Sequence, residues 1–65
     1  MKHSEAVEIW DDQVRKCFWV VHVKNGIVKQ TINDYKITNV DEATRLAKTT
    51  ASMLNLAVAK EVKKV

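Results

Sequence analysis

The dipeptide Asn25-Gly26 constrains the fold more than any other feature, because it separates two runs of strand-forming residues. Cys-Phe-Trp-Val-Val-His-Val (17–23) precedes it, and Ile-Val-Lys-Gln-Thr-Ile (27–32) follows it. Aromatic and β-branched residues favour strands. Asn-Gly tolerates the positive φ angles of a type I′ turn, whose twist matches that of the strands on either side. Gly26 is also the only glycine in the chain, so we predict an antiparallel hairpin that turns at this dipeptide.

The first strand of this hairpin, predicted over residues 14–24, has one apolar face and one mixed face. The apolar face, which we expect to pack against a helix, carries Cys17, Trp19, Val21 and Val23. The mixed face carries Lys16, Phe18, Val20, His22 and Lys24. In a two-layer domain the mixed face is exposed, and an exposed aromatic side chain between cations is typical of a contact surface. The alternative is that the N-terminal segment folds over Phe18 and Val20 and covers them.

The second strand is predicted over residues 27–37, and it leads to a helix. Polar residues interrupt the strand pattern near Asn33-Asp34, which predicts a bulge or a strand end there. From Val40 to about Leu54 the apolar residues recur at steps of three and four, as in an amphipathic helix. The apolar stripe that should face the sheet consists of Ala43, Leu46, Ala47, Thr50, Met53 and Leu54.

Both ends of this helix carry suitable capping residues. Asn39 is a good N-cap, and Glu42 completes a capping box by reaching back to the Asn39 amide. Asp41 suits the positive end of the helix dipole. Asn55 can adopt the left-handed conformation that ends a helix.

Residues 56–65 fit two interpretations. As a helix they extend the apolar stripe through Val58, Val62 and Val65, whereas as a strand they alternate between two faces. A helix of about 25 residues overhangs a small sheet, and a strand after Asn55 supplies a needed further edge. We therefore predict a strand.

Residues 1–13 are ambiguous as well. Ala6, Ile9 and Trp10 follow a helical period, whereas Val7 and Ile9 also fit a short strand that turns at Asp11-Asp12. We expect an extended or loosely attached arm, in which Trp10 either packs on the body or is available to a partner.

These elements predict a small two-layer α+β domain of order β-β-α-β, in which an antiparallel hairpin, one helix packed on the sheet and a C-terminal strand follow an N-terminal arm. Residues 1–13 form the acidic arm and residues 14–65 the single domain. The charge changes at this boundary, because residues 1–13 carry one lysine and four acidic residues, and residues 14–65 carry ten basic and four acidic residues.

Composition argues against several classes of function. In 65 residues we identify no nucleophile–base pair and no carboxylates with a reason to converge, so we do not expect an enzyme. The single cysteine, Cys17, suits a small buried residue in a reducing, cytoplasmic setting. His22 and His3 stand apart from other ligand types, so we expect no metal and no cofactor. No apolar run reaches the roughly 20 residues of a membrane span, and no signal-peptide pattern opens the chain.

Three segments together resemble a known phage family. Lys-Cys-Phe-Trp-Val-Val-His-Val (16–23), Val-Asp-Glu-Ala-Thr-Arg-Leu-Ala (40–47) and Val-Ala-Lys-Glu-Val-Lys-Lys (58–64) are similar to segments of the small inhibitors of host RNA polymerase encoded by podophages of the T-odd coliphage group. The resemblance implies a protein that binds the jaw region of the large subunit of bacterial RNA polymerase, contacts the sigma factor and blocks open-complex formation. It implies no catalysis and a site of action in the host cytoplasm.

The resemblance also assigns residues. The family's basic residues on the last strand fall on Glu61 and Lys63, or on Lys60 and Lys63 with a shift of one position, and its acidic residue at the helix start falls on Asp41. The family carries a negative strip that opposes DNA, whereas residues 14–65 are basic here. With the mixed face, the predicted partner-binding residues are Lys16, Phe18, Val20, Lys24, Asp41, Lys60 and Lys63.

Two further hypotheses belong to other classes. A small basic domain can lay an exposed sheet face on nucleic acid, with lysines on the phosphates and Phe18 stacking on a base. Alternatively, the protein inhibits another nucleic-acid enzyme, and the acidic arm acts as a nucleic-acid mimic through Glu5, Glu8, Asp11 and Asp12.

Overall fold

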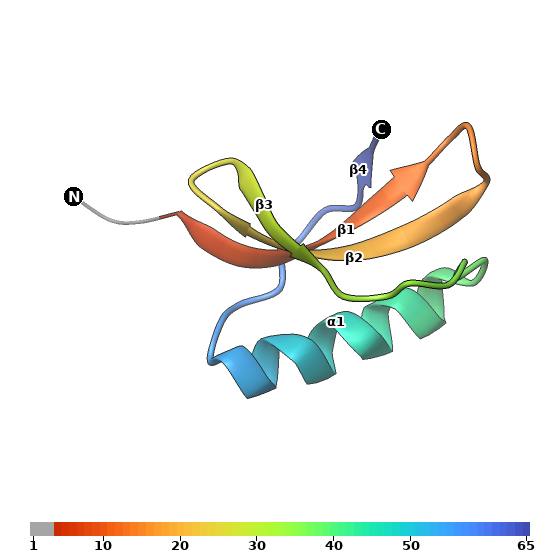
Figure 1. Cartoon of the computed structure of the whole chain (residues 1–65). Coiled ribbons are helices and arrows are strands. Elements are labelled where there is room, and N and C mark those ends of the chain that lie inside the picture. The colour runs from red at the N-terminus through yellow and green to blue at the C-terminus, as the bar shows by residue number, and fades with distance from the viewer. Residues whose placement is uncertain (1–3) are drawn as a thin grey trace.

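The chain folds into a four-stranded mixed sheet with one helix packed on one of its faces (Figure 1). The computed structural model describes residues 4–65, so residues 1–3 of the expected arm lie outside the described part. The elements are β1 (Glu5–Asp12), β2 (Cys17–Lys24), β3 (Ile27–Thr31), α1 (Val40–Leu54) and β4 (Lys63–Lys64). Their order in the sheet is β3-β2-β1-β4, with β4 parallel to β1 and the other pairs antiparallel. The predicted two-layer α+β architecture is confirmed, with one strand more than expected.

The hairpin at Asn25-Gly26 is confirmed. Asn25 has φ 54° and Gly26 has φ 80°, as a type I′ turn requires. The second strand is shorter than predicted, because β3 ends at Thr31 and Ile37 returns to the sheet only through an isolated bridge to Phe18. A bulge does occur in this hairpin. His22 pairs with Gln30 and the adjacent Val23 pairs with Val28, so Lys29 is the extra, unpaired residue on β3.

The expected N-terminal arm is wrong for residues 5–12, which form β1. This strand pairs with β2 along its whole length, from Glu5 opposite Lys24 to Asp12 opposite Cys17. The period-two pattern of Val7 and Ile9 therefore gives the better interpretation of this segment. Both side chains are almost completely buried, so β1 is a central strand and residues 14–65 do not contain the whole core.

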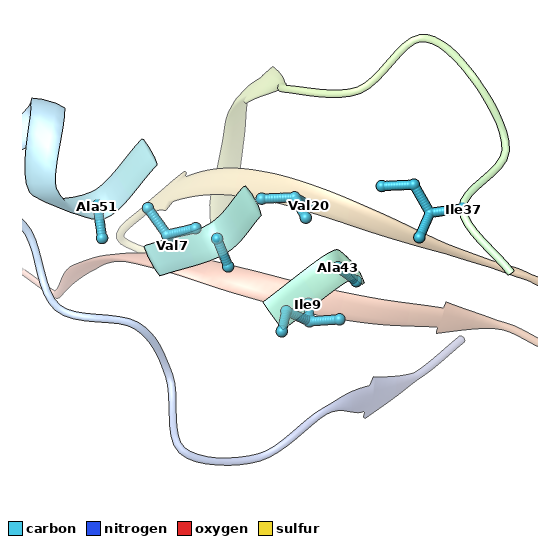
Figure 2. Close-up of a cluster of buried hydrophobic side chains, with 7 residues drawn as sticks. Val7, Ile9, Val20, Ile37, Ala43 and Ala51 are labelled. Carbon is cyan, nitrogen blue, oxygen red and sulfur yellow. The ribbon is translucent and has the colours of Figure 1, made fainter. Parts of the chain in front are cut away.

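The two faces of β2 are the reverse of the prediction. The helix packs on the face that carries Phe18 and Val20, and Val20 is fully buried in the core (Figure 2). The core cluster beneath α1 consists of Val7, Ile9, Val20, Ile37, Ala43, Ala47 and Ala51. Cys17, Val21 and Val23, which were expected to face the helix, are also buried, although they lie on the other face of β2. A helix lined by alanine approaches a sheet closely, and it fits over valine and isoleucine better than over two indoles. The face with Trp19 therefore points away from α1 and is called the open face below.

Helix α1 begins and ends where the sequence predicts. The Asn39 side chain accepts a hydrogen bond from the backbone N–H of Asp41, and Asn55 adopts the left-handed conformation, with φ 58° and ψ 44°. The buried side of α1 is narrower than the predicted apolar stripe. The helix packs on β1 and β2 but not on β3, so the side chains on its β3 side stay exposed. Met53, expected to face the sheet, is 81% exposed, and Leu54 is 42% exposed.

The C-terminal segment is extended, as predicted, and it lies beside β1 in two short pieces. Val58 bridges Val7, and β4 pairs Lys63 with Trp10. Residues 60–62 lie between the two pieces. The C-terminal segment supplies the further edge of the sheet, with β1 between it and β2.

Candidate binding face

The open face of the sheet carries both tryptophans of the chain. Trp10 on β1 and Trp19 on β2 lie directly opposite one another in the antiparallel register. Both side chains are half-buried, so each keeps part of its surface for a ligand. They border a shallow hollow of about 400 Å³, the indole hollow, lined by Trp10, Asp12, Trp19, Val21, Val28, Thr31 and Val65. The hollow thus draws on three adjacent strands and on the C-terminal residue.

Trp10 is held by polar contacts at its edge and at one face. Its indole Nε1 donates a hydrogen bond of 2.8 Å to Glu8 Oε1. Lys63 Nζ lies 5.1 Å from the ring centroid, within the range of a cation–π contact. The glutamate and the lysine come from β1 and β4. The orientation of this indole is therefore fixed before any partner binds.

Trp19 is held by the buried carboxylate of Asp12. Asp12 Oδ2 accepts hydrogen bonds from Trp19 Nε1 at 3.1 Å and from Arg15 Nη1 at 3.2 Å. Asp12 Oδ1 accepts from the backbone N–H groups of Val14, at 3.0 Å, and of Arg15, at 2.9 Å. The carboxylate therefore closes the turn between β1 and β2 and orients the indole at the same time.

These donors lower the pKa of Asp12 from its usual value of 3.8 to about 2. The largest contribution is the hydrogen bond from the backbone N–H of Arg15, followed by that from the Trp19 indole, and burial acts in the opposite direction. A carboxylate with such a pKa remains ionised at neutral pH and is a poor proton acceptor. Its role in the hollow is to hold the indole and the turn.

The described part of the chain contains neither a cluster of metal-ligand side chains nor a membrane-spanning helix. Within residues 4–65, no three histidine, cysteine, aspartate or glutamate side chains gather as metal ligands would. None of the helices in this part of the chain has the length and apolar character needed to cross a membrane. What the open face offers is two fixed aromatic surfaces beside an apolar hollow.

The structure scatters the predicted partner-binding residues. Val20 is in the core and Phe18 packs against it, so both leave the predicted contact surface. Lys16 is exposed in the turn before β2, with φ 60°, and Lys24 is half-buried at the end of β2. Lys63 alone among the seven lies on the open face, over Trp10.

The two remaining predicted residues lie outside the indole hollow. Asp41 is exposed in the first turn of α1, on the helical layer of the molecule. Lys60 is exposed between the two pieces of the C-terminal strand and lines a separate surface depression with Glu8 and Glu61.

The acidic residues of the expected arm are parts of β1. Glu5 pairs with His22, with 2.7 Å between Oε2 and Nε2, and Glu8 accepts from Trp10. Asp12 is 7% exposed, and Asp11 is half-buried. Three of the four carboxylates are thus engaged within the fold, and all four lie on a paired strand and not on a loose arm. The nucleic-acid mimic stays a prediction without the arm as its basis.

The sequence analysis missed the tryptophan pair, although a signal for it exists. Strands 5–12 and 17–24 are joined by four residues, 13–16, and a hairpin of that length places Trp10 opposite Trp19. The pairing of Trp10 with Trp19 can be predicted only if residues 5–12 are assigned as a strand. Because they were expected to form an arm, the pairing was not predicted.

Comparisons with protein-family models, with curated proteins and with solved structures give no match to this chain.

Proposed function

We propose that this protein acts by binding another protein through the open face, with an apolar side chain of the partner seated in the indole hollow. The observation that carries the proposal is the fixed pair of half-buried indoles, Trp10 and Trp19, on a sheet face that α1 leaves uncovered. Tryptophans held in one orientation lose little side-chain entropy on binding, and they are the residues most often found at the energetic centre of an interface.

The charges of this face favour a protein partner over nucleic acid. Glu8 accepts from one indole and Asp12 from the other, whereas Lys63 is the cation placed over an indole ring. Phosphates need clustered cations, while an apolar hollow with a balanced polar rim is typical of a protein interface.

The first partner to test is bacterial RNA polymerase, in the bacterial cytoplasm. The similarity of residues 16–64 to the phage inhibitors supports this partner, and Lys63 belongs both to that similarity and to the open face. On this proposal the protein binds the polymerase and blocks transcription initiation, with Trp10, Trp19 and Lys63 as contact residues and without any catalytic step.

The test uses the full chain, purified bacterial RNA polymerase holoenzyme and a promoter-dependent transcription assay. Trp10→Ala and Trp19→Ala are each expected to weaken binding and inhibition by about tenfold or more, as at other central interface residues. Tyr35→Ala is the matched control, because it removes an exposed aromatic side chain, at 52% exposed, from the segment between β3 and α1. Circular dichroism verifies that each variant is folded. Absence of polymerase binding, or equal binding by the tryptophan variants and the control, contradicts the proposal.

A second candidate function is binding of single-stranded nucleic acid. The observation that favours it is Lys63 Nζ at 5.1 Å from the Trp10 ring, a cation beside a base-stacking surface. Because both tryptophans lie on the open face, their fluorescence reports on it directly. Quenching by an oligonucleotide at about 50 mM salt that disappears as salt is raised supports this candidate, and unchanged fluorescence at the low salt concentration rejects it.

A further inference from the structure

Strand β3 is the least covered element of the sheet. All five of its residues, Ile27–Thr31, are exposed, with Ile27 at 66% and Val28 at 38%. It is the terminal strand of the order β3-β2-β1-β4, so within residues 4–65 no strand lies on its outer side. Helix α1 packs on β1 and β2 and leaves the β3 side of the sheet uncovered. The backbone groups of one β3 edge are therefore available for pairing.

An apolar groove lies beside this edge, on the helical side of the sheet. It has a volume of about 330 Å³ and is lined by Gln30, Ile32, Leu46, Thr49, Thr50, Met53 and Leu54. We call it the β3–α1 groove. Met53, at 81% exposed, and Leu54, at 42% exposed, project from α1 without cover. Both side chains lie on the side of α1 that is next to β3, beyond which the described part of the sheet has no further strand.

The open face borders the same edge. Val28 and Thr31 of β3 line the indole hollow. Side chains of a strand alternate between two faces, so a strand added beside β3 directs one set toward the β3–α1 groove and the other toward the open face. Apolar surface is thus present on both sides of the position that an added strand would occupy.

The charged residues of the β2–β3 hairpin itself are all basic. Residues 13–33 contain no acidic residue, and they carry Arg15, Lys16, Lys24 and Lys29. Lys29 is the middle residue of β3 and is exposed. A second copy of this chain, paired antiparallel through β3, brings the two exposed Lys29 side chains close together, and like charges across a strand pair destabilise it. The edge therefore disfavours self-pairing and favours a strand that carries an acidic residue.

We propose that β3 binds an extended segment of a partner protein as a fifth strand of the sheet, with an acidic residue of the segment beside Lys29 and apolar residues at alternate positions. The backbone of β3 supplies hydrogen bonds, the β3–α1 groove receives the apolar side chains, and the lysine selects the charge. This contact needs neither Trp10 nor Trp19, so it is separate from the contact proposed for the open face.

The test is a selection of short random linear peptides on the immobilised full-length protein, run in parallel on Lys29→Glu. Enriched peptides are expected to alternate apolar residues around an acidic one on the wild type, and around a basic one on the variant. Lys48→Glu is the matched control, because it makes the same charge change at an exposed position within α1. A peptide selected on the wild type should bind Lys29→Glu about tenfold more weakly and Lys48→Glu equally well.

The binding position is then read by nuclear magnetic resonance of the labelled protein with an enriched peptide. Shifts and slowed amide exchange centred on residues 27–31, retained in Trp10→Ala, support strand addition. No enriched peptide, no charge preference, or shifts confined to the open face and lost in Trp10→Ala overturn it. A wild-type dimer that pairs through β3 also overturns it. If the peptide binds along β3 but the tryptophan variants bind polymerase as well as the wild type does, only the proposed function is contradicted.

Discussion

Asp12 shows how much a single buried residue does in so small a fold. Its carboxylate accepts hydrogen bonds from two backbone N–H groups of the β1–β2 turn, from Arg15 and from the Trp19 indole. An amide in its place keeps one acceptor oxygen, whereas its NH₂ group meets the indole and guanidinium donors. Asp12→Asn is therefore expected to lower the denaturation midpoint and to loosen the indole.

The pH dependence of this effect follows from the pKa. The pKa of Asp12 in the folded protein is about 2, below the usual 3.8, so its stabilising contribution is complete above about pH 4 and is lost as the pH falls toward 2. Urea unfolding of the wild type and Asp12→Asn should differ clearly at neutral pH, and the difference should shrink below about pH 4 and vanish only as the pH falls to about 2. Asp11→Asn, which removes the neighbouring charge, is the control. A constant difference between wild type and Asp12→Asn at all pH values contradicts the assignment.

After β3 has ended, the side chain of Asn33 takes the place of a strand backbone and hydrogen-bonds to the backbone of β2. Its Oδ1 accepts from the Val20 N–H at 2.8 Å, and its Nδ2 donates to the carbonyls of Phe18, at 3.2 Å, and Tyr35, at 2.9 Å. Asn33→Ala leaves these buried groups without partners and should cost about 2–4 kcal/mol in the free energy of unfolding. Asp34→Ala, next to it and exposed, should change stability by less than about 0.5 kcal/mol. Equal losses in the two variants would show that the Asn33 contacts contribute nothing.

Neither residue role was accessible from the sequence. Asp12 looked like one of four arm carboxylates, and Asn33 like a polar interruption of a strand. Each residue has local partners in its own turn and also partners on β2, which are Trp19 for Asp12 and Phe18 and Val20 for Asn33. The contacts to β2 depend on the register between β1, β2 and the segment after β3. Three asparagines were predicted correctly from the sequence. Asn39 and Asn55 act within their own helix caps. Asn25 acts through its positive φ angle in the turn, although its side chain also accepts a hydrogen bond from the distant Ser4 N–H.

At the scale of elements, local signals were sufficient for the hairpin and the helix but not for the choice of face. Both faces of β2 are apolar in the middle, so the more apolar one was assigned to the helix. The choice is made by β1, which adds Val7 and Ile9 to the Val20 side and Trp10 to the Trp19 side. Because residues 5–12 were expected to form an arm and not a strand, the wrong face of β2 was assigned to the helix. The candidate site was therefore placed on the wrong face as well.

The face on which α1 packs can be tested by overfilling it. Ala47 is fully buried between the helix and the sheet. Ala47→Leu adds volume at a point of close approach and should cost about 1–3 kcal/mol in the free energy of unfolding. Lys48→Leu places the same side chain on the exposed side of α1 and should be neutral within about 0.5 kcal/mol. If both variants unfold at the wild-type denaturant midpoint, α1 does not pack on the sheet through Ala47.

At the scale of the whole molecule, β1 joins parts that are far apart in the sequence. It pairs with β2 on one side and with β4 and the Val58 bridge on the other, and it contributes Val7 and Ile9 to the core. Hydrogen bonds from Val7 N–H to the Ala57 carbonyl and from Ala59 N–H to the Val7 carbonyl, at 3.0 and 2.8 Å, fasten the C-terminal segment to it. A domain of this size is only marginally stable, so the loss of one central strand is enough to unfold it.

The fragment of residues 13–65 therefore should not fold, although it contains the hairpin, the helix and the C-terminal segment. Without β1, the strands β2 and β4 have no common neighbour, and the alanine-rich side of α1 loses half of the surface against which it packs. The measurements are circular dichroism and the spread of amide resonances, with residues 4–65 as the folded control. Cooperative unfolding of the 13–65 fragment would contradict this prediction, because it would show that the domain folds without residues 5–12. If a peptide of residues 4–13 restores the dispersed spectrum when added to the fragment, the deficit lies in the missing strand and not in damage to the remainder.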